Sequence, residues 1–140
     1  MKTKTPYIFL VEDDADDRFM MQQAFIDVNF ADHVRMFSSS EFFLNQINAI
    51  TDENELPTLF VLDFNMLIIN GGELLVKLKQ QEALKEIPVV LYSKGMRPIL
   101  KETLIATGAK DCFEKALDYK DLCRQVKALR FLAEGNTVVY

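Results

Sequence analysis

The stretch Leu59-Phe60-Val61-Leu62-Asp63 is the most hydrophobic strand pattern in the chain, and it ends on a carboxylate. An uninterrupted apolar run of this length is typical of a strand that is buried on both faces of a sheet. A second run, Tyr7 to Val11, is followed directly by Glu12 and Asp13. If both strands lie in one parallel sheet, their acids meet at one edge, where charges about 4 Å apart repel by roughly 4 kcal/mol at an effective dielectric near 20. Such a cluster requires a cation or a proton.

Strand patterns alternate with helix patterns along the whole chain. Continuously apolar strands joined by helices indicate a parallel sheet covered on both faces, and right-handed crossovers then give a doubly wound, three-layer α/β fold. We expect the flavodoxin-like (βα)5 form, with five parallel strands in the order 2-1-3-4-5. Strands are predicted over residues 7–11, 33–37, 59–63, 88–93 and 110–115, and helices over 15–29, 41–50, 72–81, 98–107 and 119–133.

The length of 140 residues and the ordinary globular composition predict one domain, residues 1–134, followed by a tail, residues 135–140. The net charge of −5 and the lack of a basic stripe argue against nucleic-acid binding. The first apolar run is too short for a signal peptide, and no run reaches the length of a membrane span. Cys112 and Cys123 form no disulfide framework and no metal-site spacing, so we expect a cytoplasmic protein.

Polar residues follow the predicted strands at their carboxyl ends, which form the functional edge of such a sheet. Glu12 and Asp13 follow the first strand, Asp63 ends the third, Ser93 ends the fourth and Lys115 ends the fifth. These residue types suit phosphoryl transfer, in which carboxylates hold Mg²⁺ and Asp63 is the nucleophile. Lys115 and the cation would neutralise the phosphoryl oxygens, and the Ser93 hydroxyl would donate to one of them.

This constellation resembles the receiver domain of two-component response regulators. The resemblance implies that Asp63 accepts a phosphoryl group from the phosphohistidine of a histidine kinase or phosphotransfer protein. It also implies that Asp13, Asp63 and the backbone carbonyl of Asn65 bind Mg²⁺, with Glu12 acting directly or through water. The stretches that carry the resemblance cover nearly the whole chain: Val11-Glu12-Asp13-Asp14, Asp63-Phe64-Asn65-Met66 with Gly71, Val89 to Ser93, and Gly108 to Lys115.

Further roles follow from the same resemblance. Lys115 would grip the phosphoryl group, Ser93 would move to meet it, and hydrolysis of the aspartyl phosphate would reset the switch. Such a receiver catalyses its own phosphotransfer and dephosphorylation but is not an enzyme in the usual sense. We expect a stand-alone receiver that acts on a downstream protein target. The resemblance also implies a homodimer through the face formed by residues 98–107, 110–114 and 119–132.

Three positions depart from the receiver pattern. Leu67 and Ala116 replace prolines that the family usually has, and Cys112 replaces the switch aromatic three residues before the lysine. Phe113 and Tyr92 are the candidates to replace that aromatic. A lysine followed by a small residue, with cysteine three positions earlier, is similar to single-domain receivers that partner bacterial phytochromes.

Several residues have simpler interpretations. Asp14, Asp16 and Asp17 are expected at a solvated helix start, where acids favour the helix dipole. His33, on a predicted edge strand, is expected at the surface, and Cys112 is expected to be a small core residue. The apolar loop Met66 to Ile69 has two interpretations: packing under the neighbouring helix, which we favour slightly, and a docking patch for a partner.

Two other functions were weighed. A phosphatase of the haloacid-dehalogenase type also has an aspartate nucleophile after an apolar strand. It needs a second aspartate two residues later, where this chain has Asn65, and its other acidic pair comes late in the chain, whereas Glu12 and Asp13 come first. A pseudo-receiver, which keeps the fold without phosphorylation, is compatible with the missing prolines and with Cys112, but the retained acids and Lys115 argue against it.

Overall fold

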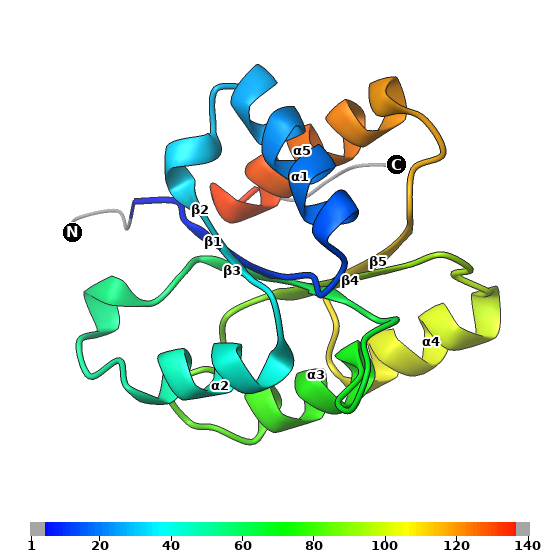
Figure 1. Ribbon diagram of the computed structural model, residues 1–140. Helices are drawn as coiled ribbons and strands as arrows, with labels where there is room; N and C mark the ends of the chain where they lie inside the picture. The colour runs from blue at the N-terminus through cyan, green and yellow to red at the C-terminus, as the bar shows by residue number, and fades with distance from the viewer. Residues whose placement is uncertain (1–4, 137–140) are drawn as a thin grey trace.

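A computed structural model describes residues 5–136, which form a parallel five-stranded sheet with helices on both faces (Figure 1). The strand order is β2-β1-β3-β4-β5, so the predicted fold and strand order are confirmed. The strands are β1 (Ile8–Val11), β2 (Val34–Phe37), β3 (Leu59–Asp63), β4 (Val89–Ser93) and β5 (Asp111–Glu114). The helices are α1 (Ala15–Asp27), α2 (Ser40–Asn48), α3 (Gly71–Lys79), α4 (Pro98–Thr107) and α5 (Tyr119–Ala133), with short 3₁₀ helices η1 (Ala31–His33) and η2 (Glu53–Glu55).

The sheet separates two hydrophobic layers. Figure 1 shows α1 and α5 on one face of the sheet and α2, α3 and α4 on the other. Successive strand residues point to opposite faces, so Ile8 and Leu10 pack in the layer of α1 and α5, whereas Phe9 and Val11 pack in the layer of α2, α3 and α4. Every residue of β1, β3 and β4 is buried, which explains why these strands read as uninterrupted apolar runs.

Side-chain caps fix where most of the helices begin. Ser39 accepts a hydrogen bond from the backbone N–H of Phe42 at 3.1 Å and so caps α2. Pro98 occupies the first turn of α4, and Gly108 follows its last residue with a φ of 123°. Asp14, Asn70 and Asp118 cap α1, α3 and α5 in the same way as Ser39 caps α2.

Four of the strands are one or two residues shorter than predicted, and the second and fifth strands show why. His33 was assigned to the second strand and to the surface, but it ends η1, is half-buried and stacks on Phe30 with ring centroids 5.0 Å apart. Its Nδ1 lies 3.0 Å from the Pro6 carbonyl, so His33 packs beside the start of β1. The fifth strand is shorter by a residue at each end, yet the N–H groups of Lys110 and Lys115 still donate to Val89 and Ser93.

The predicted tail, residues 135–140, lies outside the described residues from 137 onward, while Gly135 and Asn136 still donate backbone hydrogen bonds to the last turn of α5. Within residues 5–136, the helices are all too short or too polar to cross a lipid bilayer.

Gly71 brings the start of α3 against the end of β3. A Cβ at this position would lie 2.7 Å from the backbone oxygen of Asp63 and 2.9 Å from the Cα of Phe64. Both atoms belong to backbone that is held in the sheet edge, so neither can move aside at low cost. The absence of a side chain at position 71 therefore helps to place Asp63.

We expect Gly71→Ala to lower the free energy of unfolding by about 1–3 kcal/mol, because the added methyl overpacks the contact with β3. Gly95→Ala is the matched control: a Cβ there meets nothing within 4 Å, so its effect should stay within about 0.5 kcal/mol. Urea denaturation followed by circular dichroism measures both. Equal stabilities of the two variants would contradict the role assigned to Gly71.

Candidate functional site

The carboxyl ends of the strands bring the predicted site residues together. Glu12 follows β1, while Asp63 and Ser93 are the last residues of β3 and β4. The parallel register places Val11 beside Leu62 and Asp63 beside Tyr92, so these ends lie at one edge of the sheet. Glu12, Asp63 and Ser93 are almost completely buried, with 0%, 1% and 2% exposed. These polar groups must therefore satisfy one another within the protein.

Lys115 is the cation that the acids share. Its Nζ lies 3.2 Å from Asp63 Oδ2, 3.3 Å from Glu12 Oε1 and 3.1 Å from Asp17 Oδ2. Asp17 lies in the first turn of α1, as expected, with its side chain 39% exposed, and it also reaches Lys115. Asp14 precedes this turn and accepts a hydrogen bond from the N–H of Asp17 at 2.9 Å. The structure thus adds Asp17 to the predicted set.

The charges in the site are strongly coupled. Burial and, after it, the contact with the Asp63 carboxylate together raise the pKa of Glu12 to about 8, against the opposing effects of the Asp14 N–H and the Lys115 charge. Burial also disfavours the Lys115 ammonium, but Glu12 and Asp63 outweigh that effect and raise the pKa of Lys115. Lys115 is therefore charged at neutral pH, and Glu12 resolves part of the crowding by holding a proton.

Three carboxylates could hold a divalent cation. Glu12, Asp13 and Asp63 each offer an oxygen, and these oxygens lie within 4.8 Å of one another. An all-oxygen, mostly anionic donor set is the kind that Mg²⁺ prefers, so the residues fit such an ion. Asp13 is further oriented because its Oδ2 accepts a hydrogen bond from the Leu67 N–H at 3.2 Å.

Asn65 links the ends of β3 and β4. Its N–H donates to Asp63 Oδ1 at 2.9 Å, which fixes one oxygen of that carboxylate. Its side-chain Oδ1 accepts hydrogen bonds from Ser93 Oγ at 3.1 Å and from the Lys94 N–H at 3.0 Å. The sequence suggested a role only for the Asn65 backbone carbonyl, because the side-chain contact depends on the pairing of two strands.

Tyr92 also belongs to the site. Its hydroxyl donates to Glu12 Oε1 at 2.9 Å, and the Lys115 Nζ lies 5.2 Å from the centre of its ring. Burial and the neighbouring acids raise the pKa of Tyr92 well above its ordinary value, so the phenol stays a hydrogen-bond donor. In the sequence Tyr92 stood out only as a candidate switch aromatic.

The structure shows how two of the departures from the receiver pattern, Cys112 and Ala116, are accommodated. Cys112 is 3% exposed in the layer of α2, α3 and α4, and burial raises the pKa of its thiol to about 11, so it is a core residue as predicted. Tyr92 and Phe113 pack on the opposite face of the sheet, so neither occupies the place of Cys112. All peptide bonds among residues 5–136 are trans, including the bond before Ala116.

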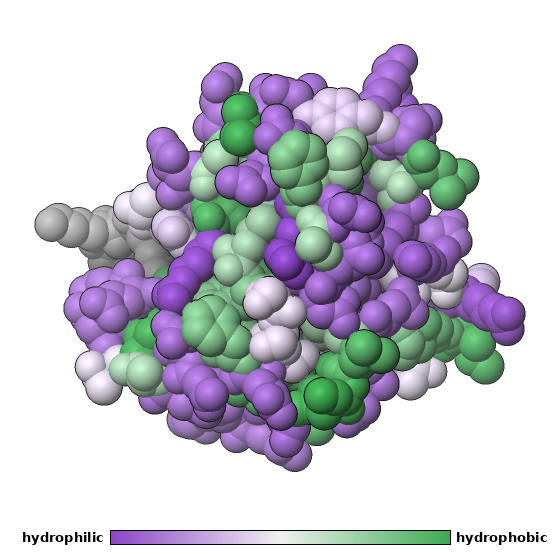
Figure 2. All heavy atoms as spheres, viewed as in Figure 1, coloured by the Kyte–Doolittle hydropathy of each residue, from purple (hydrophilic) through white to green (hydrophobic). Residues whose placement is uncertain are grey.

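In the loop between β3 and α3, some apolar residues pack into the core and others are exposed. Met66 is buried and Ile69 packs against the core, whereas Leu67 and Ile68 are 83% and 86% exposed. Ile68 has a φ of 68°, which a β-branched residue rarely adopts, and the Ile69 N–H donates to the Leu67 carbonyl across it. Figure 2 shows hydrophobic atoms gathered over this loop.

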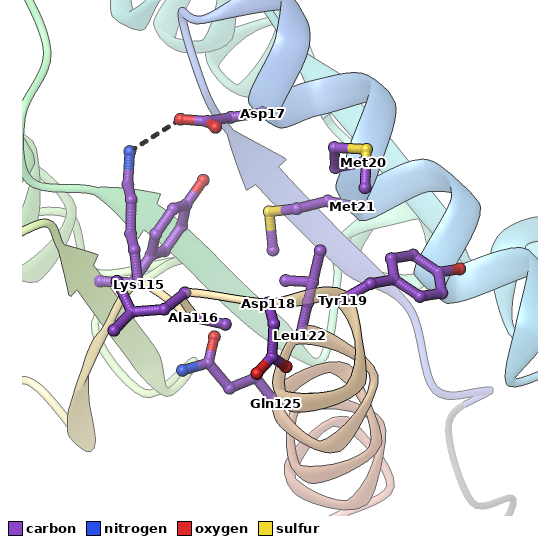
Figure 3. A pocket seen from close by; sticks show the side chains of 11 residues that line it. Asp17, Met20, Met21, Lys115, Ala116, Asp118, Tyr119, Leu122 and Gln125 are labelled. Carbon is purple, nitrogen blue, oxygen red and sulfur yellow. Dashed lines mark hydrogen bonds and ion pairs between the residues drawn. The ribbon is translucent and has the colours of Figure 1, made fainter.

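A cavity of about 210 Å³ adjoins the site between α1 and the start of α5. Figure 3 shows Lys115 on one side of it, joined to Asp17, with Met20 and Met21 of α1 on another and Leu122 of α5 nearby. The remaining lining residues are Tyr92, Ala116, Leu117, Asp118, Tyr119 and Gln125. Lys115 and Tyr92 thus separate the acidic site from this more apolar space.

Comparisons with known proteins show which family the sequence matches. A sequence model of the family described as response regulator receiver domain matches residues 8–127. The two-component response regulator ORR3 of rice, Oryza sativa subsp. indica, is 27% identical over an alignment that covers 90% of this chain and 98% of ORR3.

Solved structures of response regulators have the same fold. The phosphorylated cyanobacterial phytochrome response regulator RcpA has a TM-score of 0.78 at 23% identity, covering 95% of this chain and 96% of RcpA. The Mn²⁺-bound form of response regulator Rcp1 has a TM-score of 0.75 at 22% identity, covering 97% of this chain and 99% of Rcp1. At these identities the likeness concerns the fold.

The stability of the metal-free protein should fall as pH rises from about 4.5 to about 8. The ordinary pKa of Glu12 is 4.5 and its folded value is about 8, so between these values the folded protein keeps a proton that the unfolded chain releases. One such proton lowers the free energy of unfolding by at most about 1.4 kcal/mol per pH unit. Urea denaturation in EDTA across this range measures the slope. Glu12→Gln lacks this proton, so an unchanged slope in that variant would assign the effect elsewhere.

Proposed function

Because the chain belongs to the response regulator receiver domain family, we propose that it is a phosphorylation-controlled signalling receiver whose phosphoryl acceptor is Asp63. The observation that carries this proposal is the setting of the Asp63 carboxylate at the end of β3. One oxygen accepts from the Asn65 N–H at 2.9 Å and the other lies 3.2 Å from the Lys115 Nζ. The carboxylate is thereby held in one orientation beside a fixed positive charge.

The proposed reaction uses the residues as they are arranged. A carboxylate oxygen of Asp63 attacks the phosphorus of a phosphohistidine on a histidine kinase or phosphotransfer protein. The new P–O bond forms as the P–N bond breaks, and the imidazole leaves with the electron pair. Lys115 turns from the acids to the phosphoryl oxygens, and the Ser93 hydroxyl leaves Asn65 to donate to one of them. Water later hydrolyses the aspartyl phosphate and restores Asp63.

Mg²⁺ is the proposed cofactor. Glu12, Asp13, Asp63 and the backbone carbonyl of Asn65 would hold it, and when bound it neutralises charge on the transferred phosphoryl group. The Mn²⁺-bound form of response regulator Rcp1, which has the same fold, supports the binding of a divalent cation by this chain. The charge balance supports it too, because within residues 5–136 Lys115 is the one basic side chain that forms ion pairs with Glu12, Asp17 and Asp63.

The wider assignment completes the proposal. We assign residues 1–134 as a receiver, similar to phytochrome-partner receivers, that signals to a downstream protein in the cytoplasm. The face of α4, β5 and α5 is the proposed homodimer surface, and Ile99 on it is 73% exposed. A pseudo-receiver is disfavoured by the assembled acids and Lys115. A haloacid-dehalogenase-type phosphatase is disfavoured because Asn65, at the position of its second acid, bonds to Ser93 and Lys94 instead.

Acetyl phosphate with Mg²⁺ should phosphorylate the protein on Asp63. On a phosphate-affinity gel the wild type should give a retarded band that Asp63→Asn does not give, because the amide cannot act as the nucleophile. Asp52→Asn is the matched control, since Asp52 is an exposed carboxylate in the loop before β3. No Asp63-dependent band, with the cognate kinase also failing to produce one, would favour the pseudo-receiver.

The exposed tip formed by Leu67 and Ile68 should help a kinase to dock, since it lies in the loop that follows Asp63. We expect the double substitution Leu67→Ser and Ile68→Ser to lower kcat/KM for phosphotransfer from the cognate kinase about tenfold, the effect of losing about 1.4 kcal/mol of contact. Phosphorylation by acetyl phosphate should keep its rate. Val76→Ser, at a half-exposed position on α3, serves as control. Unchanged kinase kinetics in the double variant would exclude this docking role.

A further inference from the structure

The Tyr92 hydroxyl is a polar group in an otherwise apolar layer. Tyr92 is 6% exposed and packs with Ile8, Leu10 and Val90 in the layer of α1 and α5. A buried hydroxyl of this kind needs a partner, and the partner here is Glu12 Oε1 at 2.9 Å. Tyr92 therefore connects the fourth strand to an acid that follows the first strand.

Glu12 is completely buried, and its two oxygens have three donors. Oε2 accepts from the Asp14 N–H at 3.1 Å, while Oε1 accepts from the Tyr92 hydroxyl at 2.9 Å and lies 3.3 Å from the Lys115 Nζ. The three donors differ in whether Glu12 has them to itself. The Asp14 N–H and the Tyr92 hydroxyl donate to Glu12, whereas Lys115 is shared with Asp17 and Asp63.

This difference matters for the proposed reaction, on which the present inference rests. When Lys115 turns to the phosphoryl oxygens, Glu12 loses that contact on Oε1. Tyr92 then remains as the side-chain donor to this oxygen among the contacts described. Its ring is buried in the apolar layer of α1 and α5, so the hydroxyl has less freedom to move than the long side chain of Lys115.

We propose that Tyr92 is a positioning residue that holds the Glu12 carboxylate toward the divalent-cation site and so sets the affinity for the cation. Hydrogen-bond partners that orient a metal ligand typically contribute 10–100-fold to metal affinity. The Tyr92 hydroxyl fits that role because it bonds to Glu12 Oε1 from a ring that packs in the layer of α1 and α5.

The test measures Mg²⁺ binding to the full chain by isothermal titration calorimetry. Tyr92→Phe, which removes only the hydroxyl oxygen, should weaken Mg²⁺ binding about tenfold, the lower end of the range for such partners. Tyr119→Phe is the matched control, because the Tyr119 hydroxyl also bonds to a carboxylate, that of Asp27 at the end of α1. The Tyr119→Phe variant should have an Mg²⁺ dissociation constant within twofold of that of the wild type.

A double-mutant cycle separates positioning from a general loss of structure. If Tyr92 acts through Glu12, the change Tyr92→Phe should have little further effect on Mg²⁺ affinity in a Glu12→Gln background, whereas a loosened site would weaken both backgrounds alike. Equal Mg²⁺ affinities of wild type and Tyr92→Phe would overturn the inference while Asp63-dependent phosphorylation stands. A wild type that binds no Mg²⁺ would overturn both the inference and the proposed cofactor.

Discussion

The ammonium group of Lys115 is the charge on which the edge of the sheet depends. It lies within 3.3 Å of carboxylate oxygens from Glu12, Asp17 and Asp63, and two of these acids are almost completely buried. Without it, strands β1 and β3 would bring like charges together in a low-dielectric environment, which would cost several kcal/mol. One cation does not balance three acids. Burial and, after it, the contact with Asp63 raise the pKa of Glu12, so a proton on Glu12 removes part of the negative charge. The remaining negative charge makes the site suited to a divalent cation.

The rest of the architecture holds this charge cluster in place. The all-apolar strands β1 and β3 pair in register, so their ends meet, and Gly71 lets the start of α3 approach the backbone of Asp63. The side chain of Asn65 then ties the end of β3 to Ser93 at the end of β4. The site is thus built on strand ends rather than on free loops, which gives its members defined orientations before any partner arrives.

Much of this could be predicted from the chain. The run Leu59 to Asp63 indicated a buried parallel strand, and the alternation with helices indicated the fold and the edge at which acids, hydroxyl and lysine meet. Asp17 lies at the helix start as predicted, but its contact with Lys115 was not predicted, because position in a first helical turn does not show which way a side chain points. His33 was misplaced for a related reason: its contacts with Phe30 and Pro6 come from packing, not from the pattern around it.

The sequence by itself determined the order of the elements, the burial of the central strands and the residue types at their carboxyl ends, because hydrophobic periodicity and chain order are local properties. Only the tertiary structure decided which groups bond within the site. The Tyr92–Glu12 and Asn65–Ser93 contacts join residues 80 and 28 positions apart. Their existence depends on strand register and rotamers, which are set by packing across the whole sheet. The sequence thus placed an acid at residue 12, but only the folded structure shows that the Tyr92 hydroxyl bonds to it.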